Sequence, residues 1–205
     1  MPRLYVGTKK GLFVLDRDSA GDWKVVGTGF LGDPVPSLLP ERDGETLRVA
    51  LQHGHFGAKF HVSRDGGATF EEAALPVYPE KPDGFVDRCP MRKTDRPWSL
   101  ELTWALEQGT PYEAGRLWCG TIPGGLFRSD DDGATWTMVR SLWDRPERLT
   151  HWMGGGYDHP GIHSIVVDPR DGTHVMAAIS CGGVWRTRDD GETWEQTAHG
   201  MRADF

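Results

Sequence analysis

One short pattern recurs four times along this chain: an apolar segment that leads into a turn rich in aspartate and glycine. The apolar segments are GLFV (11–14), AKFH (58–61), GLFR (125–128) and GVWR (183–186). The turns that follow read SRDGGATF (63–70), SDDDGATW (129–136) and TRDDGETW (187–194), and the first segment leads into a degenerate DRDSAGDW (16–23). Internal periods of roughly 50 to 65 residues favour propeller blades or another repeat array.

The residues around each turn predict four antiparallel strands per repeat. In the fourth repeat these are HSIVVD (163–168), HVMAAIS (174–180), VWRT (184–187) and a strand that starts at Thr193. The second and third repeats follow the same order, and no stretch has the length and caps of a helix. We therefore predict an all-β propeller with four blades in a single domain (1–205). The predicted blades span residues 3–30, 35–75, 98–141 and 162–198.

The first repeat lacks its innermost strand. RLYVGT (3–8) begins two residues into the chain and already matches a second strand, and the chain stops at Phe205, soon after the fourth outer strand. Two blade faces would then expose apolar surface. We predict that these residues are the N-terminal part of a larger ring of six to eight blades. Self-association and a compact four-bladed ring are the alternatives.

The charge and cysteine content argue against several classes of partner. The formal charge is −7, which is the wrong sign for binding nucleic acid or an anionic membrane. No signal sequence or apolar span of about 20 residues is found, so we expect a soluble, cytoplasmic protein. Cys89, Cys119 and Cys181 are far apart and predict neither a disulfide framework nor a zinc site. No cofactor is predicted.

The turn motif S-x-D-x-G-x-T-W resembles the Asp box, or bacterial neuraminidase repeat, of sialidases, related glycosidases, sortilin-type receptors and photosystem-assembly propellers. The resemblance implies a structural hairpin between the third and fourth strands of a blade. The aspartates would accept backbone N–H groups, the glycines would take a positive φ, and the aromatic residues would pack the turn on the blade. These residues are Asp65, Asp131 and Asp189; Gly67, Gly133 and Gly191; and Phe70, Trp136 and Trp194. A calcium loop is the competing interpretation, but it needs a twelfth-position carboxylate and flanking helices that the sequence does not show.

The unusual residues lie in the loops at the blade ends opposite these turns, around the predicted central opening. Two loops of about 20 residues, 76–98 and 142–163, are long enough to indicate a functional role. QHGHFG (52–57) adds His53 and His55, and the second long loop adds Tyr157, Asp158, His159 and His163. His163 matches Trp98 of the third blade and should face the opening. Imidazoles beside a carboxylate suit a metal or proton transfer, and stiffening of a glycine-rich loop is the alternative.

Glycoside hydrolysis needs two carboxylates, or a tyrosine with a carboxylate, across a pocket. We therefore predict Asp158 as the acid, with His163 or Tyr157 beside it, and His53, His55, Arg92, Trp98 and His159 as ligand-binding residues. Further carboxylates in the same loops are Asp87, Asp95 and Asp144. The sialidase Arg-Ile-Pro motif is absent. Arg88, Arg92 and Arg96 could clamp a carboxylate, and Trp98, Trp104, Trp143 and Trp152 could stack on sugars, although solvated charges and core packing are the commoner roles.

The predicted function is a sialidase-like propeller that binds a small polar ligand or glycan at this end of the blades, with glycoside-hydrolase-like chemistry. The second hypothesis is a noncatalytic binding or assembly scaffold. A metal site at the histidines is a further alternative, and no metal ligand is assigned.

Overall fold

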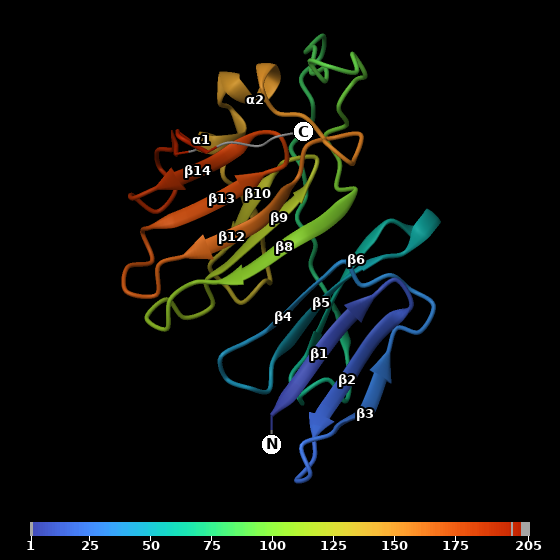
Figure 1. Ribbon diagram of the computed structural model, residues 1–205. Helices are drawn as coiled ribbons and strands as arrows, with labels where there is room; N and C mark the ends of the chain where they lie inside the picture. The colour runs from blue at the N-terminus through green and yellow to red at the C-terminus, as the bar shows by residue number, and fades with distance from the viewer. Residues whose placement is uncertain (1, 198, 202–205) are drawn as a thin grey trace. The chain divides into compact units, whose positions relative to one another are not determined.

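The computed structural model describes residues 2–197 and 199–201, and the chain divides into two compact units, Met1–Leu75 and Pro76–Phe205 (Figure 1). Each unit contains two antiparallel sheets in which consecutive strands are neighbours. The all-β prediction with propeller-type blades is confirmed. That the chain forms a single domain stays a prediction.

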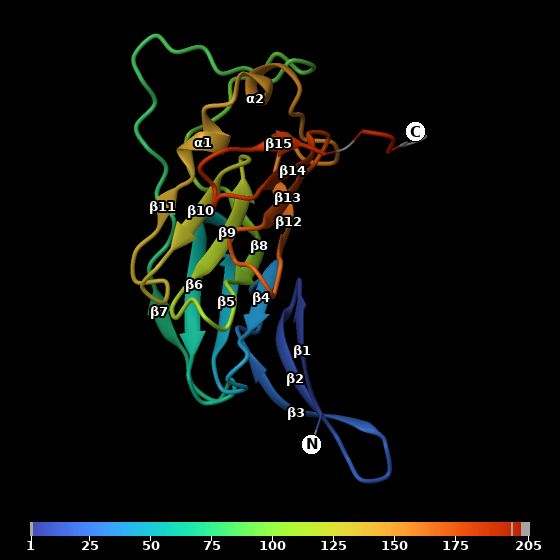
Figure 2. The same cartoon turned by 90° about the vertical axis from the view of Figure 1, so that its left-hand side faces the viewer.

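The first unit contains a three-stranded and a four-stranded sheet (Figure 2). The first sheet consists of β1 (Arg3–Thr8), β2 (Gly11–Arg17) and β3 (Trp23–Gly29). The second sheet consists of β4 (Ser37–Pro40), β5 (Leu47–Gln52), β6 (Ala58–Ser63) and β7 (Glu71–Ala73), and the short 3-10 helix η1 (Gly54–Phe56) lies between β5 and β6. The strand β1 pairs with β2 as β5 pairs with β6. Among residues 2–197 and 199–201, the first sheet therefore has no innermost strand, as the sequence predicts.

The second unit contains two four-stranded sheets and two short helices. Its first sheet consists of β8 (Leu102–Gln108), β9 (Leu117–Ile122), β10 (Leu126–Ser129) and β11 (Thr137–Met138). Its second sheet consists of β12 (Ile162–Val167), β13 (Val175–Ile179), β14 (Gly183–Thr187) and β15 (Glu195–Gln196). The helices α1 (Arg140–Trp143) and α2 (Pro146–Thr150) lie in the loop between the sheets, where the sequence predicts none. Each is about one turn long, which is too short to leave a periodic pattern.

Burial separates the inner strands of each sheet from its edges. Every residue of β9 is buried, and five of the six residues of β5 are buried. The outer strand β3, in contrast, exposes Trp23, Val25 and Val26. Strands that are covered on both faces read as continuous apolar runs, which is why the second strand of each repeat is the easiest to find in the sequence.

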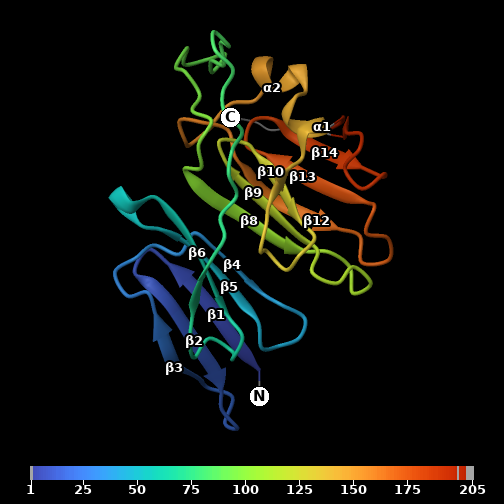
Figure 3. The ribbon, with the colours of Figure 1, turned by 180° about the vertical axis from the view of Figure 1, so that it is seen from behind.

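In the second unit, β12 lies beside β8 and β9 (Figure 3). The close approach depends on Gly120 in β9, because a Cβ there would lie 2.7 Å from the Cγ2 atom of Ile162. Around this contact, a core of large side chains joins the two sheets and includes the fully buried Trp118, Trp152 and Trp185. The two sheets therefore form one packed body.

The third and fourth strands are joined by turns with one shared hydrogen-bond pattern, which we call the aspartate turns (63–70, 129–136 and 187–194). In the second of them, Asp131 Oδ1 accepts the backbone N–H of Thr135 at 2.8 Å, and Ser129 Oγ accepts the N–H of Gly133 at 2.8 Å. Gly133 has a φ of 79°, a region that favours glycine. The equivalent bonds recur in the other two turns.

Each aspartate turn is also tied to the turn that joins the first and second strands of its own sheet. In each sheet, a backbone N–H of the aspartate turn donates to a backbone carbonyl oxygen of the turn between the first and second strands. The donor and acceptor pairs are Gly66 and Glu45 at 2.8 Å, Asp132 and Gly115 at 3.0 Å, and Asp190 and Thr173 at 3.1 Å. Both turns therefore lie at the same end of each sheet. The connections between the second and third strands lie at the other end.

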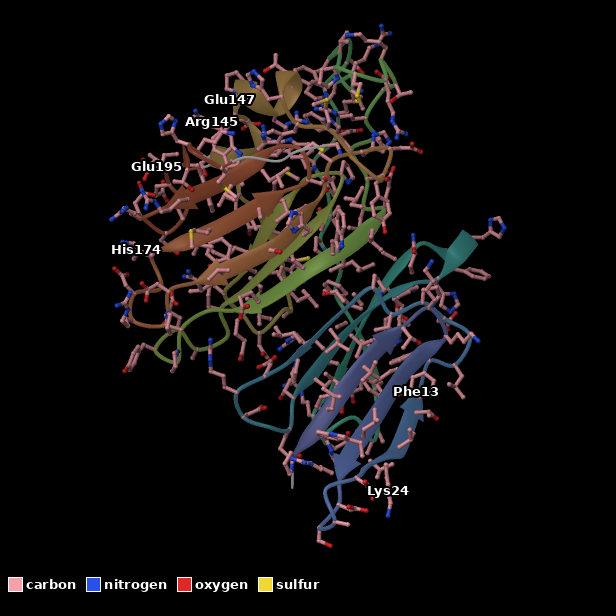
Figure 4. All side chains as sticks on the ribbon, in the orientation of Figure 1. Phe13, Lys24, Arg145, Glu147, His174 and Glu195 are labelled. Atoms are coloured by element: carbon pink, nitrogen blue, oxygen red, sulfur yellow. The ribbon has the colours of Figure 1, made fainter. Side chains whose placement is uncertain are left out.

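Side chains near the edges of the second unit form local ion pairs. Arg145 and Glu147, at the start of α2, are joined by an Nη2–Oε1 contact of 2.8 Å (Figure 4). Glu195 of β15 accepts from Arg186 of β14 at 2.9 Å. Exposed pairs of this kind contribute little to stability. In the part of the chain that the structure describes, no helix is long and apolar enough to cross a membrane.

We expect acid to destabilise the fold, because the aspartate turns depend on hydrogen bonds to ionised carboxylates. Hydrogen bonds from Thr187 and Thr193 hold the pKa of Asp189 down to about 2, and those from Thr69 and Ser63 do the same for Asp65. A depressed pKa in the folded state contributes stability above the unfolded pKa of about 4, and that stability is lost as pH falls from there towards 2. Asp189→Asn should therefore lower the urea concentration at the midpoint of unfolding at pH 7. Between pH 4 and pH 2, this midpoint should fall less in the variant than in the wild type. Asp83→Asn, at an exposed loop position, is the control, and equal pH dependence in both variants would contradict this account.

Candidate functional site

Two long loops of the second unit, 76–98 and 142–163, meet at the end of the sheets opposite the aspartate turns, which we call the loop end. A buried ion network joins them. Asp87, with no exposed surface, accepts from Arg148 at 2.6 Å and lies 3.3 Å from Arg96 Nη1. Arg96 also donates to the carbonyl oxygens of Arg148 at 2.7 Å and Trp152 at 2.6 Å. One carboxylate therefore fixes both loops relative to each other.

Aromatic side chains surround this network. Trp98 donates its indole N–H to Asp87 Oδ2 at 2.9 Å and meets Phe85 and Trp143 edge-on, at centroid distances of 5.5 and 5.3 Å. The Arg148 guanidinium lies 3.9 Å from the centre of the Trp143 ring, a cation–π contact. Trp143 and Trp152 are 2 % and 0 % exposed, so these two rings pack the loops and offer no surface to a sugar.

The three arginines of the first long loop do not converge on one point. Arg96 is buried against Asp87, Arg88 lies 3.6 Å from Asp95, and Arg92 forms an ion pair with Asp158. A clamp for a substrate carboxylate needs guanidinium groups aimed at a common position. The sequence alternative of an Arg88–Arg92–Arg96 clamp is therefore not assembled, because each guanidinium is already occupied by a different aspartate.

An aromatic cluster at the loop end contains two of the predicted catalytic residues. The ring of Trp104, in β8, lies 4.9 Å from the ring of Tyr157 and 5.7 Å from that of His163. Tyr157 is 46 % exposed, and His163 is exposed with its Nδ1 atom 2.9 Å from Ser164 Oγ. The cluster thus offers partly exposed rings to a ligand.

The position of Trp104 corrects the sequence alignment of the two sheets. The pairing of β8 with β9 shifts register between Thr103 and Ala105, and that of β12 with β13 shifts between Ile162 and Ser164. The residue inside each irregularity is Trp104 or His163, so His163 corresponds to Trp104 and not to Trp98. Trp98 precedes β8 by four residues. Such bulges redirect side chains, and the sequence carries no signal for them.

Carboxyl groups flank the aromatic cluster. Asp158 follows Tyr157 and is 78 % exposed in its ion pair with Arg92. Glu101, which directly precedes β8, lies 3.5 Å from Nε2 of His159, whose side chain is only 11 % exposed. Burial raises the pKa of the Glu101 carboxyl; the His159 imidazole opposes this shift, and the negative charge of Asp158 reinforces it. Tyr157, Asp158, His159 and His163 therefore come together with Trp104 and Glu101.

Glu101 was not among the sequence candidates. It lies in WSLELTWAL (98–106), where the predicted strand starts at Trp98, and in a strand that begins there a glutamate is an ordinary surface residue. The strand starts at Leu102, which leaves Glu101 at the loop end. The one sequence feature that could have identified Glu101 is that it is a polar residue at the junction of a long loop and a strand.

His53 and His55 lie in the first unit. His53 Nε2 is 3.1 Å from Asp33 Oδ2, and its ring meets the exposed Phe56 at 5.6 Å. His55 is exposed at the end of η1. Within residues 2–197 and 199–201, no group of three or more His, Cys, Asp or Glu side chains is arranged to hold a metal ion.

A hollow of about 420 Å³ lies on the second sheet of the second unit, formed by β12 to β15. Its lining includes Val166, Met176 and Arg186, which are neighbours across β12, β13 and β14. None of the candidate site residues lines it. Convergent polar and aromatic groups identify a site better than volume does, so we place the candidate site at the aromatic cluster.

Comparison with known proteins finds similarity to xyloglucanases. No family model matches the chain. An oligoxyloglucan-reducing end-specific xyloglucanase of Emericella nidulans is 29 % identical over 72 % of this chain and 16 % of its own length. A probable enzyme of the same name from Neosartorya fischeri is 28 % identical over 82 % of this chain and 19 % of its own length. The chain thus spans less than a fifth of these relatives.

The crystal structure of the GH74 xyloglucanase from Xanthomonas campestris is similar in fold. It superposes on 95 % of this chain and 27 % of its own with a TM-score of 0.58, at 19 % identity. That likeness supports the propeller fold. The sequence relatives named above are xyloglucanases, so the sialidase-like part of the expected resemblance is not confirmed.

Proposed function

We propose that this chain contributes a glycan-binding surface to a glycoside-hydrolase-like propeller, and that its ligand is a xyloglucan-type oligosaccharide. The observation that carries the proposal is the contact of Trp104 with Tyr157 and His163, beside the carboxyl groups of Asp158 and Glu101. Aromatic faces cover the apolar faces of sugar rings, and carboxylates accept their hydroxyl groups. The similarity to xyloglucanases supports the substrate class.

The ion pair between Arg92 and Asp158 favours a neutral glycan over a sialylated one. A sialic acid carboxylate would need a free guanidinium, and this pair occupies Arg92. Arg96 is likewise held by Asp87. We therefore retain the glycoside-hydrolase-like function and replace sialic acid with an uncharged oligosaccharide as the proposed ligand.

Trp104→Ala should weaken binding of a xyloglucan oligosaccharide about tenfold, which corresponds to about 1.4 kcal/mol, because the stacking surface between Tyr157 and His163 is removed. Isothermal titration calorimetry on the full protein measures this. Trp23→Ala is the matched control, since Trp23 is 45 % exposed on β3 of the first unit, and it should leave affinity unchanged. Equal affinity in the two variants, or tighter binding of sialyllactose than of the xyloglucan oligosaccharide, would contradict the proposal.

A further inference from the structure

We propose that Glu101 is the proton donor of the candidate site, and that Asp158 is the carboxylate that accepts the proton of the attacking water. This assignment rests on the glycoside-hydrolase-like function proposed above. It differs from the sequence hypothesis, in which Asp158 is the acid. It adds a residue that no sequence motif identifies.

A backbone hydrogen bond fixes Glu101 at the end of the sheet formed by β8 to β11. Its N–H donates to the carbonyl oxygen of Ile122 at 2.9 Å, so the residue is held against the end of β9 although it precedes β8. Trp104 follows three residues later in the same segment. The carboxyl group and the aromatic platform are therefore carried by one short, well-anchored stretch of chain.

The groups that face Glu101 come from both long loops. His159 lies 3.5 Å away, Asp158 is its neighbour in sequence, and Arg92 pairs with Asp158. The Nε2 atom of His159 is the one that lies 3.5 Å from the carboxyl group, and its Nδ1 atom is buried with no hydrogen-bond partner among the described residues.

The two carboxyl groups differ in exposure. Asp158 is 78 % exposed and is ion-paired with the Arg92 guanidinium, and we assign it the role of base. Glu101 is half as exposed, at 40 %, and burial raises its pKa, which suits a carboxylic acid that gives up a proton. A carboxyl group whose pKa is raised by burial, beside a second and more exposed carboxyl group, is an arrangement found in acid–base pairs of enzymes.

Hydrolysis of the glycosidic bond consumes one water molecule. The Glu101 carboxylic acid gives its proton to the glycosidic oxygen as the bond from that oxygen to the anomeric carbon breaks. A water oxygen bonds to the anomeric carbon, and Asp158 takes the proton that the water loses. The products are two sugar fragments with free hydroxyl groups. Transfer of a proton from Asp158 to solvent, and from solvent to Glu101, restores the starting state.

The test compares Glu101→Gln with the wild type on two substrates, using the full protein. One substrate is a xyloglucan oligosaccharide, and the other is a 2,4-dinitrophenyl glycoside of the same sugar. Dinitrophenolate leaves without protonation, so the variant should keep its turnover of the second substrate and lose about 10²- to 10⁴-fold in kcat on the first. Glu71→Gln, at an exposed position on β7, should match the wild type on both.

The pH profile gives a second readout. A proton donor must be protonated, so wild-type kcat/KM on the oligosaccharide should fall as pH rises through the pKa of Glu101, and Glu101→Gln should lack this alkaline limb. Equal loss on both substrates, or no loss on either, would overturn the role of Glu101 while leaving the proposed function standing. A wild-type protein that hydrolyses neither substrate would instead remove the hydrolase-like function, and the proton donor with it.

Discussion

Asp87→Ala is expected to lower the free energy of unfolding of the second unit by about 3–5 kcal/mol, the cost of breaking a buried ion pair by removing one partner. Asp87 has no exposed surface, and Arg96 and Arg148 are 1 % and 4 % exposed. Without the carboxylate, two buried guanidinium groups lose their counterion. The indole N–H of Trp98 loses its acceptor as well. The energetic cost is therefore shared by both long loops.

Urea unfolding followed by tryptophan fluorescence measures this change. Asp95→Ala is the matched control, because Asp95 belongs to the same loop and is 67 % exposed in its pair with Arg88; its effect should stay below about 1 kcal/mol. If the two variants unfold at the same urea concentration, the network does not hold the loops. Binding of the xyloglucan oligosaccharide should also weaken in Asp87→Ala, since the loops carry Tyr157 and Asp158.

Trp152→Ala is expected to cost about 3–5 kcal/mol, the range for a large aromatic side chain removed from a core. The ring is 0 % exposed and lies 5.9 Å from the ring of Trp185. It fits because two glycines leave space for it: a Cβ at Gly124 or Gly182 would come within 3.3 or 3.0 Å of its atoms. Trp152 therefore anchors the second long loop, which also carries Tyr157 and Asp158, to the core.

The control for this variant is Trp23→Ala, which removes the same side chain from an exposed position and should cost under about 1 kcal/mol. Thermal and urea unfolding of both variants give the comparison. A Trp152→Ala protein as stable as Trp23→Ala would show that the second long loop is held by other contacts.

The repeats, the strand order and the missing innermost strand could all be predicted from the sequence. The aspartate turns explain why: Asp131 and Thr135 are four residues apart, and so are Ser129 and Gly133. Hydrogen bonds over such short separations depend only on the local residue types. The same holds for β5 and β9, whose burial on both faces requires unbroken apolar runs.

The candidate site could be predicted only in part. Tyr157, Asp158, His159 and His163 were identified because an unusual loop carries them, and the structure brings them together. Trp98 stays a predicted ligand-binding residue, and the structure adds that its indole donates to Asp87 and packs between Phe85 and Trp143. The bulges at Trp104 and His163 explain why the alignment of the two sheets was offset.

What the sequence determined by itself is the propeller-type architecture, because periodic burial and short-range turn chemistry are written residue by residue. What only the tertiary structure decided is which loop side chains meet. Arg96 reaches Trp152 across 56 positions, and Arg92 reaches Asp158 across 66. Contacts at such separations depend on how the sheets pack and where a strand bulges, and that is why Glu101 became visible beside His159 only in three dimensions.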